Sequence, residues 1–187
     1  MYPNFKDLST EKNIKSKIAY AILNNKIKKI TRQKGTFNLE NAKSIGILFN
    51  ARNIAYYNSA REFFNYLKNK RIDIWSLGYT EDPDVIEAYS YQIGMNHFTK
   101  KSLNWYKKPK GNNIDQFINK ELDILIDLSL IDFFPIHYIV GLSKAKMKVG
   151  IYQEHSKYYD LMIDIGDNKN LDFYIEQLKH YLSIIKP

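Results

Sequence analysis

Five polar residues stand at or near the predicted ends of apolar strands, and their side chains are of the kinds that bind small polar ligands. They are Asn50, Arg52, Asp127, Ser129 and His137. Parallel strands bring their carboxyl ends to one edge of a sheet, where open α/β sheets bind ligands. Amides, carboxylates and hydroxyls hydrogen-bond to sugars and nucleotides. The pattern therefore marks a candidate binding site for a sugar-like or nucleotide-like ligand.

The same residues also have a structural interpretation, which we favour. Asn and Asp side chains often cap turns and helix starts by accepting hydrogen bonds from backbone N–H groups. His137 lies inside the apolar segment 135–142, where we expect a partly buried structural histidine. We assign no catalytic residue and expect a protein without enzymatic activity; a ligand-binding or enzymatic site at the sheet edge is the alternative.

Several common chemistries lack their motifs in this chain. It has no cysteine, which excludes disulfides, thiolate zinc sites and cysteine nucleophiles. The four histidines show neither HxH nor HxxxH spacing, so we expect no metal site. Neither GxGxxG nor GxxxxGK[ST] occurs, which disfavours dinucleotide and P-loop sites. The sequence predicts no cofactor.

The positive charge is concentrated near the N-terminus. Residues 11–34 hold eight basic residues against Glu11 alone, a net +7 of the +8 of the whole chain. The arm residues that we select as candidates for anion binding are Lys26, Lys28, Lys29, Arg32 and Lys34.

A second basic segment, 100–113, contains five lysines, no acid and the adjacent aromatic pair Trp105-Tyr106. Loop signals such as Pro109 and Gly111 predict an exposed loop. The candidates that we select there are Lys100, Lys101, Trp105, Lys107 and Lys108.

Together the two basic segments suggest an anionic partner. Lysines neutralise phosphates and aromatic side chains stack on unpaired bases, so RNA, DNA or a ribosome is the candidate partner, although such segments are more often merely solvated. Peripheral contact with a membrane surface is less expected, and a merely solvated face is the alternative interpretation.

The positions of the apolar residues predict the fold. Ser44–Asn50 and 122–128 are near-continuous apolar runs, typical of parallel strands covered on both faces. Further strands are expected at 71–77, 95–99, 147–152 and 161–165, and helices at 55–70, 82–91, 114–120, 135–142 and 171–185. This alternation predicts an α/β chain: a single Rossmann-like three-layer domain (35–187) with a mostly parallel sheet, preceded by a basic helical arm (1–34).

The arm has apolar residues on two faces. Ile14, Ile18 and Ile22 share one face, while Ala19, Leu23, Ile27 and Ile30 lie roughly opposite. We expect a kink near Asn24-Asn25 or a helix held on two sides. Docking between subunits, which would make a homo-oligomer, is therefore a further hypothesis.

The segment 122–150 carries a family resemblance. It reads LDILIDL, then an apolar helix, then LSKAKMKVG. This pattern, together with the chain length and the strand Ser44–Asn50, resembles a family of short uncharacterised bacterial Rossmann-like α/β proteins. About thirty residues are more distantly similar to the acceptor-side half of heptosyltransferase-type glycosyltransferases, which implies a degenerate enzyme of that type as one form of the ligand-binding hypothesis.

The sequence shows no sign of export or membrane insertion. Residues 1–7 lack the apolar run of a signal peptide, and the most apolar later stretch, 122–142, is interrupted by Asp127, Asp132, Pro135 and His137. We expect no transmembrane segment and a cytoplasmic location.

Overall fold

The computed structural model describes residues 5–51, 53–89, 93–153 and 157–186. Arg52 and the predicted end of the helix at Tyr91 lie outside these ranges. The described helices are α1 (Phe5–Ile27), α2 (Ile54–Asn69), α3 (Pro83–Tyr89), η1 (Lys100–Ser102, a 3₁₀ turn), α4 (Asn112–Asn119), α5 (Phe134–Leu142) and α6 (Leu171–Ile184). The described strands are β1 (Ser44–Asn50), β2 (Asp73–Tyr79), β3 (Met95–Phe98), β4 (Ile124–Asp127), β5 (Met147–Ile151) and β6 (Leu161–Ile163).

The six strands form one sheet in the order β3-β2-β1-β4-β5-β6. Every strand pair in it is parallel. The direction of strand progression reverses between β1 and β4, where Leu48 pairs with Asp127. This is the strand order of the Rossmann fold. The predicted Rossmann-like α/β domain is therefore confirmed.

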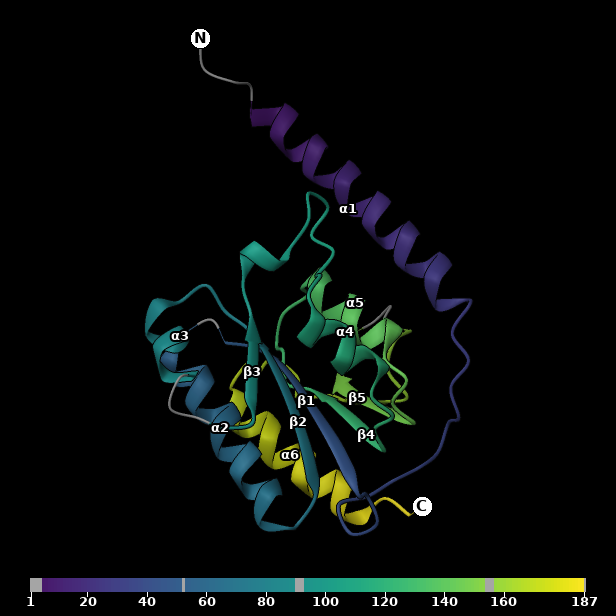
Figure 1. Ribbon diagram of the computed structural model, residues 1–187, viewed down its shortest axis with the longest axis vertical. Helices are drawn as coiled ribbons and strands as arrows, with labels where there is room; N and C mark the ends of the chain where they lie inside the picture. The colour runs from purple at the N-terminus through teal and green to yellow at the C-terminus, as the bar shows by residue number, and fades with distance from the viewer. Residues whose placement is uncertain (1–4, 52, 90–92, 154–156, 187) are drawn as a thin grey trace.

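Helices cover both faces of the sheet, which explains why β1 is apolar without alternation. Ile45, Ile47 and Phe49 belong to the core cluster that includes residues of α2 and α6. Leu48 points into the other cluster, which includes residues of α4 and α5. Figure 1 shows these layers, with α2 and α6 on one side of the strands and α4 and α5 on the other.

The helix α1 packs on the outer side of α5 (Figure 1). Ala19 and Leu23 are buried there in a small cluster with residues of α5. The close approach requires Gly141, since a Cβ atom at this position would lie 2.8 Å from Cδ1 of Ile27. The apolar stripe through Ala19 and Leu23 thus faces α5, while Ile14, 52% exposed, lies on the outer face.

The arm differs from the prediction in where its helix ends. We expected a helical arm up to Lys34, either kinked near Asn24-Asn25 or held on two sides, but α1 runs through these asparagines and ends at Ile27. After a turn, the chain continues without helix to the start of β1 and runs down the side of the domain (Figure 1). We call residues 28–43 the strap.

Tertiary hydrogen bonds explain why the strap is not helical. Both terminal nitrogens of Arg32 are engaged: Nη1 donates to the carbonyl oxygens of Ala145 and Lys146, each at 3.0 Å, and Nη2 donates to the Asp160 carboxylate at 2.5 and 2.7 Å. The N–H of Gly35 also donates to the carbonyl of Lys146. These bonds to the end of the α5–β5 loop and to Asp160, the residue before β6, outweigh the intrinsic helix propensity of the segment.

The packing of α1 predicts different effects for two substitutions on its opposite faces. Leu23→Ala should lower the free energy of unfolding by about 2–4 kcal/mol, because it leaves a cavity against α5. Ile18→Ala, on the exposed face of the same helix, should cost about 0.5 kcal/mol or less. Urea denaturation of both variants measures the difference. Equal effects would mean that α1 does not pack on the domain in solution.

Candidate functional site

The sheet edge at the reversal of strand order is filled by protein side chains. The Asp127 carboxylate is 3% exposed and accepts hydrogen bonds from the Ser129 N–H at 2.8 Å and the Tyr159 hydroxyl at 2.6 Å. The hydroxyl of Tyr174, on α6, donates to the Asp127 carbonyl at 3.1 Å. Asp127 and Ser129 are thus brought together, as predicted, but in the interior.

The tyrosine reaches Asp127 because Gly150 has no side chain. A Cβ atom on Gly150 would lie 2.5 Å from the Tyr159 ring. Burial raises the pKa of Asp127, although the hydrogen bonds from Tyr159 and Ser129 oppose this rise. Burial, and then the Asp127 charge, raise the pKa of Tyr159, so this tyrosine stays protonated as a donor. The arrangement satisfies a buried carboxylate and presents no open face to a ligand.

Asn50 lies in a different environment from Asp127. Its side chain is 7% exposed and borders a shallow pocket that Tyr79, Glu81 and Phe133 also line. Neither Asp127 nor Ser129 lines this pocket. The carboxyl edge therefore does not assemble the cluster that the sequence suggested.

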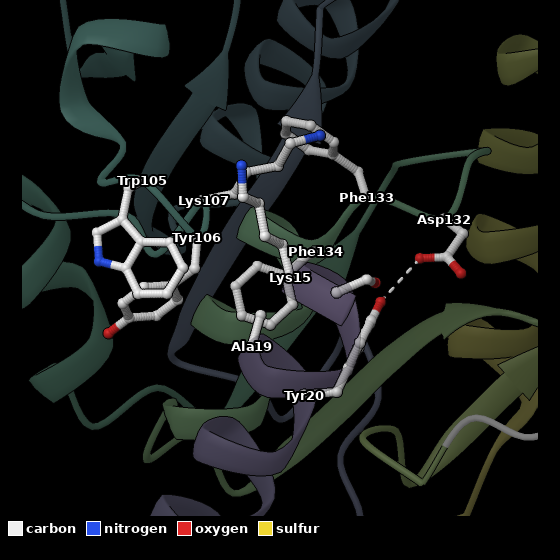
Figure 2. A pocket seen from close by; sticks show the side chains of 10 residues that line it. Lys15, Ala19, Tyr20, Trp105, Tyr106, Lys107, Asp132, Phe133 and Phe134 are labelled. Atoms are coloured by element: carbon white, nitrogen blue, oxygen red, sulfur yellow. Dashed lines mark hydrogen bonds between the residues drawn. The ribbon is translucent and has the colours of Figure 1, made fainter. Parts of the chain in front are cut away.

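A different pocket lies on the α5 side, between α1 and the second basic segment. This pocket has a volume of about 410 Å³, within the range of ligand clefts. We call it the aromatic pocket. Its lining residues are Lys15, Ser16, Ala19, Tyr20, Trp105, Tyr106, Lys107, Asp132, Phe133 and Phe134. Figure 2 shows Trp105 and Tyr106 at one end and Tyr20 with Asp132 at the other.

The 100–110 segment is folded, although we expected an exposed loop. Leu103 and Pro109 form an antiparallel bridge, and the Asn104 side chain accepts hydrogen bonds from the N–H groups of Tyr106 and Lys108. Lys107 takes a left-handed conformation with φ 64° to close the turn. These contacts hold Trp105, Tyr106 and Lys107 at the tip of a small hairpin, which we call the tip. Trp105 remains 67% exposed.

A hydrogen-bond network forms the other end of the aromatic pocket. The Tyr20 hydroxyl donates to Oδ1 of Asp132 at 3.0 Å and lies 3.0 Å from Nδ1 of His137. Nδ1 of His137 also lies 3.4 Å from Oδ1 of Asp132, so the three side chains form one network. Burial, followed by the nearby Asp132 charge, raises the pKa of Tyr20. His137 is itself 4% exposed, so it contacts the Tyr20 hydroxyl from the interior of the domain.

The basic candidates of the arm have unequal roles. Lys28 and Lys29 are exposed on the turn after α1. Lys26 donates to the Tyr138 hydroxyl at 3.1 Å. Lys34 is 72% exposed and lies 3.2 Å from the Asp160 carboxylate, whereas Arg32 is 12% exposed and anchors the strap.

The lysines of the second segment lie on or beside the tip. Lys100 and Lys101 are exposed on η1, and Lys107 borders the aromatic pocket. Lys108 stacks over the Tyr138 ring at 5.9 Å from its centroid, and Lys26 lies over the same ring at 5.7 Å. The two basic segments therefore converge on α5.

Of the pocket lining, the sequence pointed to Trp105 and Lys107. The lining residues that it missed are Lys15, Ser16, Ala19, Tyr20, Tyr106, Asp132, Phe133 and Phe134. Lys15, Ala19 and Tyr20 share one side of α1 by helical spacing. No local pattern relates them to 132–134, since the contact depends on how α1 crosses α5.

Comparison with protein-family models identifies one match, over residues 15–185. Its description is a family of unknown function, DUF6913. The chain belongs to this family. The match includes every residue that lines the aromatic pocket, so the pocket lies within the family domain. No curated protein matches the chain significantly. Membership of an uncharacterised family is thus confirmed, while bacterial origin and the likeness to heptosyltransferase-type enzymes stay predictions.

Two further properties concern the described residues only. Among them, no helix combines the length and hydrophobicity needed to cross a bilayer. Three or more histidine, aspartate or glutamate side chains do not gather in a metal-binding arrangement in the described ranges.

The buried Asp127 contact predicts a stability effect. Tyr159→Phe should lower the free energy of unfolding by about 1–3 kcal/mol, because it leaves a buried carboxylate with one donor fewer. Since the lost hydrogen bond lowered the pKa of Asp127, the deficit should grow as pH rises through the range where this carboxyl ionises. Chemical denaturation at several pH values measures this, with Tyr152→Phe, an exposed tyrosine, as control. The same loss in both variants would contradict the assignment.

Proposed function

We propose that this protein binds single-stranded RNA, with an unpaired base in the aromatic pocket and the adjoining phosphates on surrounding lysines. The supporting observation is that residues of both basic segments line the aromatic pocket. Lys15 comes from the basic arm, and Trp105, Tyr106 and Lys107 come from the second basic segment. Two segments distant in sequence thus combine aromatic rings and cations at one place.

The aromatic side chains suit an unpaired base. Trp105 and Tyr106 pack edge to face with ring centroids 5.0 Å apart, and Tyr20 packs in the same way on Phe134. Exposed aromatic faces stack on bases, and each stacked base contributes about 1–3 kcal/mol. Asp132, 75% exposed, offers an acceptor for the N–H groups on the edge of a base. RNA presents such unstacked bases in loops and bulges.

The surrounding lysines suit a phosphate backbone. Lys26 and Lys108 lie 5.7 and 5.9 Å from the Tyr138 ring centroid, and Lys28 and Lys29 are exposed on the turn after α1. Cations that neutralise phosphates release condensed counterions, so the binding would weaken as salt increases. DNA and an RNA assembly such as the ribosome are the other anionic partners to compare.

A specific observation also favours the alternative of docking through α1. Ile14 and Ile18 are 52% and 41% exposed on its outer face. A second copy of the chain covering this face would give a homodimer. Light scattering of the free protein, and of an Ile14→Ser/Ile18→Ser double variant, decides between a monomer and a dimer.

The pocket predicts how RNA binding responds to substitution. Trp105→Ala should weaken binding of an oligouridine of about ten nucleotides by tenfold or more, because the stacking of one base is lost. Lys15→Ala with Lys107→Ala should lower the salt dependence, by about 0.7 in logarithmic slope for each phosphate contact removed. Fluorescence anisotropy between about 50 and 200 mM salt measures both, with DNA of the same length as comparison.

Matched controls lie elsewhere on the domain. Trp75 lies on β2 beneath Lys120, outside the aromatic pocket, so Trp75→Phe should bind as the wild type does. Lys68→Ala, on α2, is the corresponding control for charge. Binding that is independent of salt, or equal in Trp105→Ala and the wild type, would reject the proposal.

A further inference from the structure

A second pocket, separate from the aromatic pocket, is surrounded by cations. Its volume is about 400 Å³. We call it the Lys148 pocket. Its lining residues are Ile27, Ile30, Thr31, Arg32, Lys34, Gly141, Lys148, Lys157 and Tyr158. The strap, the end of α5, β5 and the segment before β6 thus each contribute to it.

Lys148 is an unusual residue in this position. It is the second residue of β5, a strand that pairs with β4 on one side and β6 on the other, and it is only 3% exposed. Its Nζ donates to the carbonyl oxygen of Gly141 at 3.3 Å, which directs the side chain to the α5 side, where the pocket lies. An ammonium group can donate three hydrogen bonds, and burying it is costly unless they and its charge are satisfied.

Among the described residues, four basic side chains and no carboxylate line the pocket. Asp160 contacts residues of this lining but is already shared: it receives two hydrogen bonds from Arg32, contacts Lys34 at 3.2 Å and accepts the backbone N–H of Lys148. These bonds outweigh the effect of burial and lower the pKa of Asp160, so it is a carboxylate. Among the described residues, Asp160 thus contacts Arg32, Lys34 and the backbone N–H of Lys148, while Lys157 also lines the pocket.

The surrounding positive charges and burial both act on the pKa of Lys148. Burial, and then the charges of Arg32 and Lys34, lower its pKa to about 7, against the partial opposition of Asp160. The other groups that face it are Lys157 and Tyr158. On the same strand side, Lys146 is paired with Asp123 at 2.9 Å. On α5, His137 lies one turn before Gly141 and packs on the Tyr158 ring.

We propose that the Lys148 pocket binds a phosphate group, either as free phosphate or as part of a phosphorylated ligand. A dianion balances the cationic excess and gives the Lys148 ammonium further acceptors. Phosphate suits the arrangement because its several oxygens accept from donors in different directions, here Lys148 on β5, Lys34 and Thr31 on the strap and Lys157 before β6. Arg32 has both terminal nitrogens engaged and holds the strap in place.

Anion binding in the Lys148 pocket should depend on pH. Lys148 is charged below its pKa and neutral above it, so an anion that requires the ammonium binds more weakly as pH rises through about 7. Sulfate is the appropriate probe for this profile, because it remains a dianion over the range in which phosphate itself titrates. Inorganic phosphate is the second probe.

Calorimetric titration of the full chain with sulfate and with phosphate, against chloride at equal ionic strength, tests the proposal. Sulfate affinity should fall by about fivefold or more between about pH 6 and pH 8.5. Lys148→Met should weaken binding by about tenfold or more and remove the pH dependence. Lys68→Met on α2 should change neither. No binding of either anion, or equal binding in Lys148→Met and the wild type, would overturn the proposal.

Folding of the Lys148→Met variant is checked separately. Because the folded state releases the Lys148 proton near pH 7 and the unfolded state near 10.5, the wild type should gain stability relative to this variant as pH rises through that window. A parallel pH dependence of stability in the two proteins would show Lys148 to be an ordinary exposed lysine and would overturn the inference.

Two further measurements separate this pocket from RNA binding. Trp105→Ala should bind sulfate as the wild type does, while it loses affinity for oligouridine. Lys148→Met should keep its affinity for oligouridine if the ligand is free phosphate or a small phosphorylated molecule. If it loses affinity for both, the phosphate belongs to a nucleic-acid strand. If the protein binds sulfate but not RNA, the phosphate site is supported and only the proposed RNA-binding function is rejected.

Discussion

The packing of α1 on α5 is the contact on which both pockets depend. Leu23 is fully buried in it, and Gly141 allows the two helices to approach closely. The aromatic pocket takes one wall from α1, and the Lys148 pocket takes residues from the end of α1 and from the strap that follows it. Apolar burial between two helices therefore helps to position the charged and aromatic side chains of both pockets.

A second constraint acts at the centre of the sheet. Rossmann-like folds commonly bind ligands where the strand order reverses, between β1 and β4 in this chain. Here the Asp127 carboxylate already accepts hydrogen bonds from the Tyr159 hydroxyl and the Ser129 N–H. The Tyr174 hydroxyl donates to the backbone carbonyl of Asp127. A buried carboxylate with satisfied oxygens gains nothing from a ligand. The polar side chains that remain accessible line the two pockets on the α5 side and the shallow pocket beside Asn50.

The elements of the domain could be predicted because local patterns reflect burial on both sheet faces. The strand Ser44–Asn50 has the predicted bounds, and α2 and α6 agree with their predicted ranges to within a residue. The end of the arm helix could not be predicted in this way. Lys28 to Lys34 have good helix propensity, but the bonds of Arg32 to Ala145, Lys146 and Asp160 exist only when the domain has folded.

The sequence by itself determined the α/β class, the parallel sheet and the two basic segments, because hydrophobic periodicity and charge are local properties. Only the tertiary structure decided which polar residues meet. In the folded chain Asp127 is buried, and Lys15 lies in the same pocket as Trp105 of the tip. Lys148, a polar residue in an otherwise apolar strand, lines a cationic pocket. Some of these contacts, such as that between Lys15 and Trp105, join residues about ninety positions apart in the sequence. Others depend on the burial of a single side chain. Both kinds result from tertiary packing, which no local sequence pattern encodes.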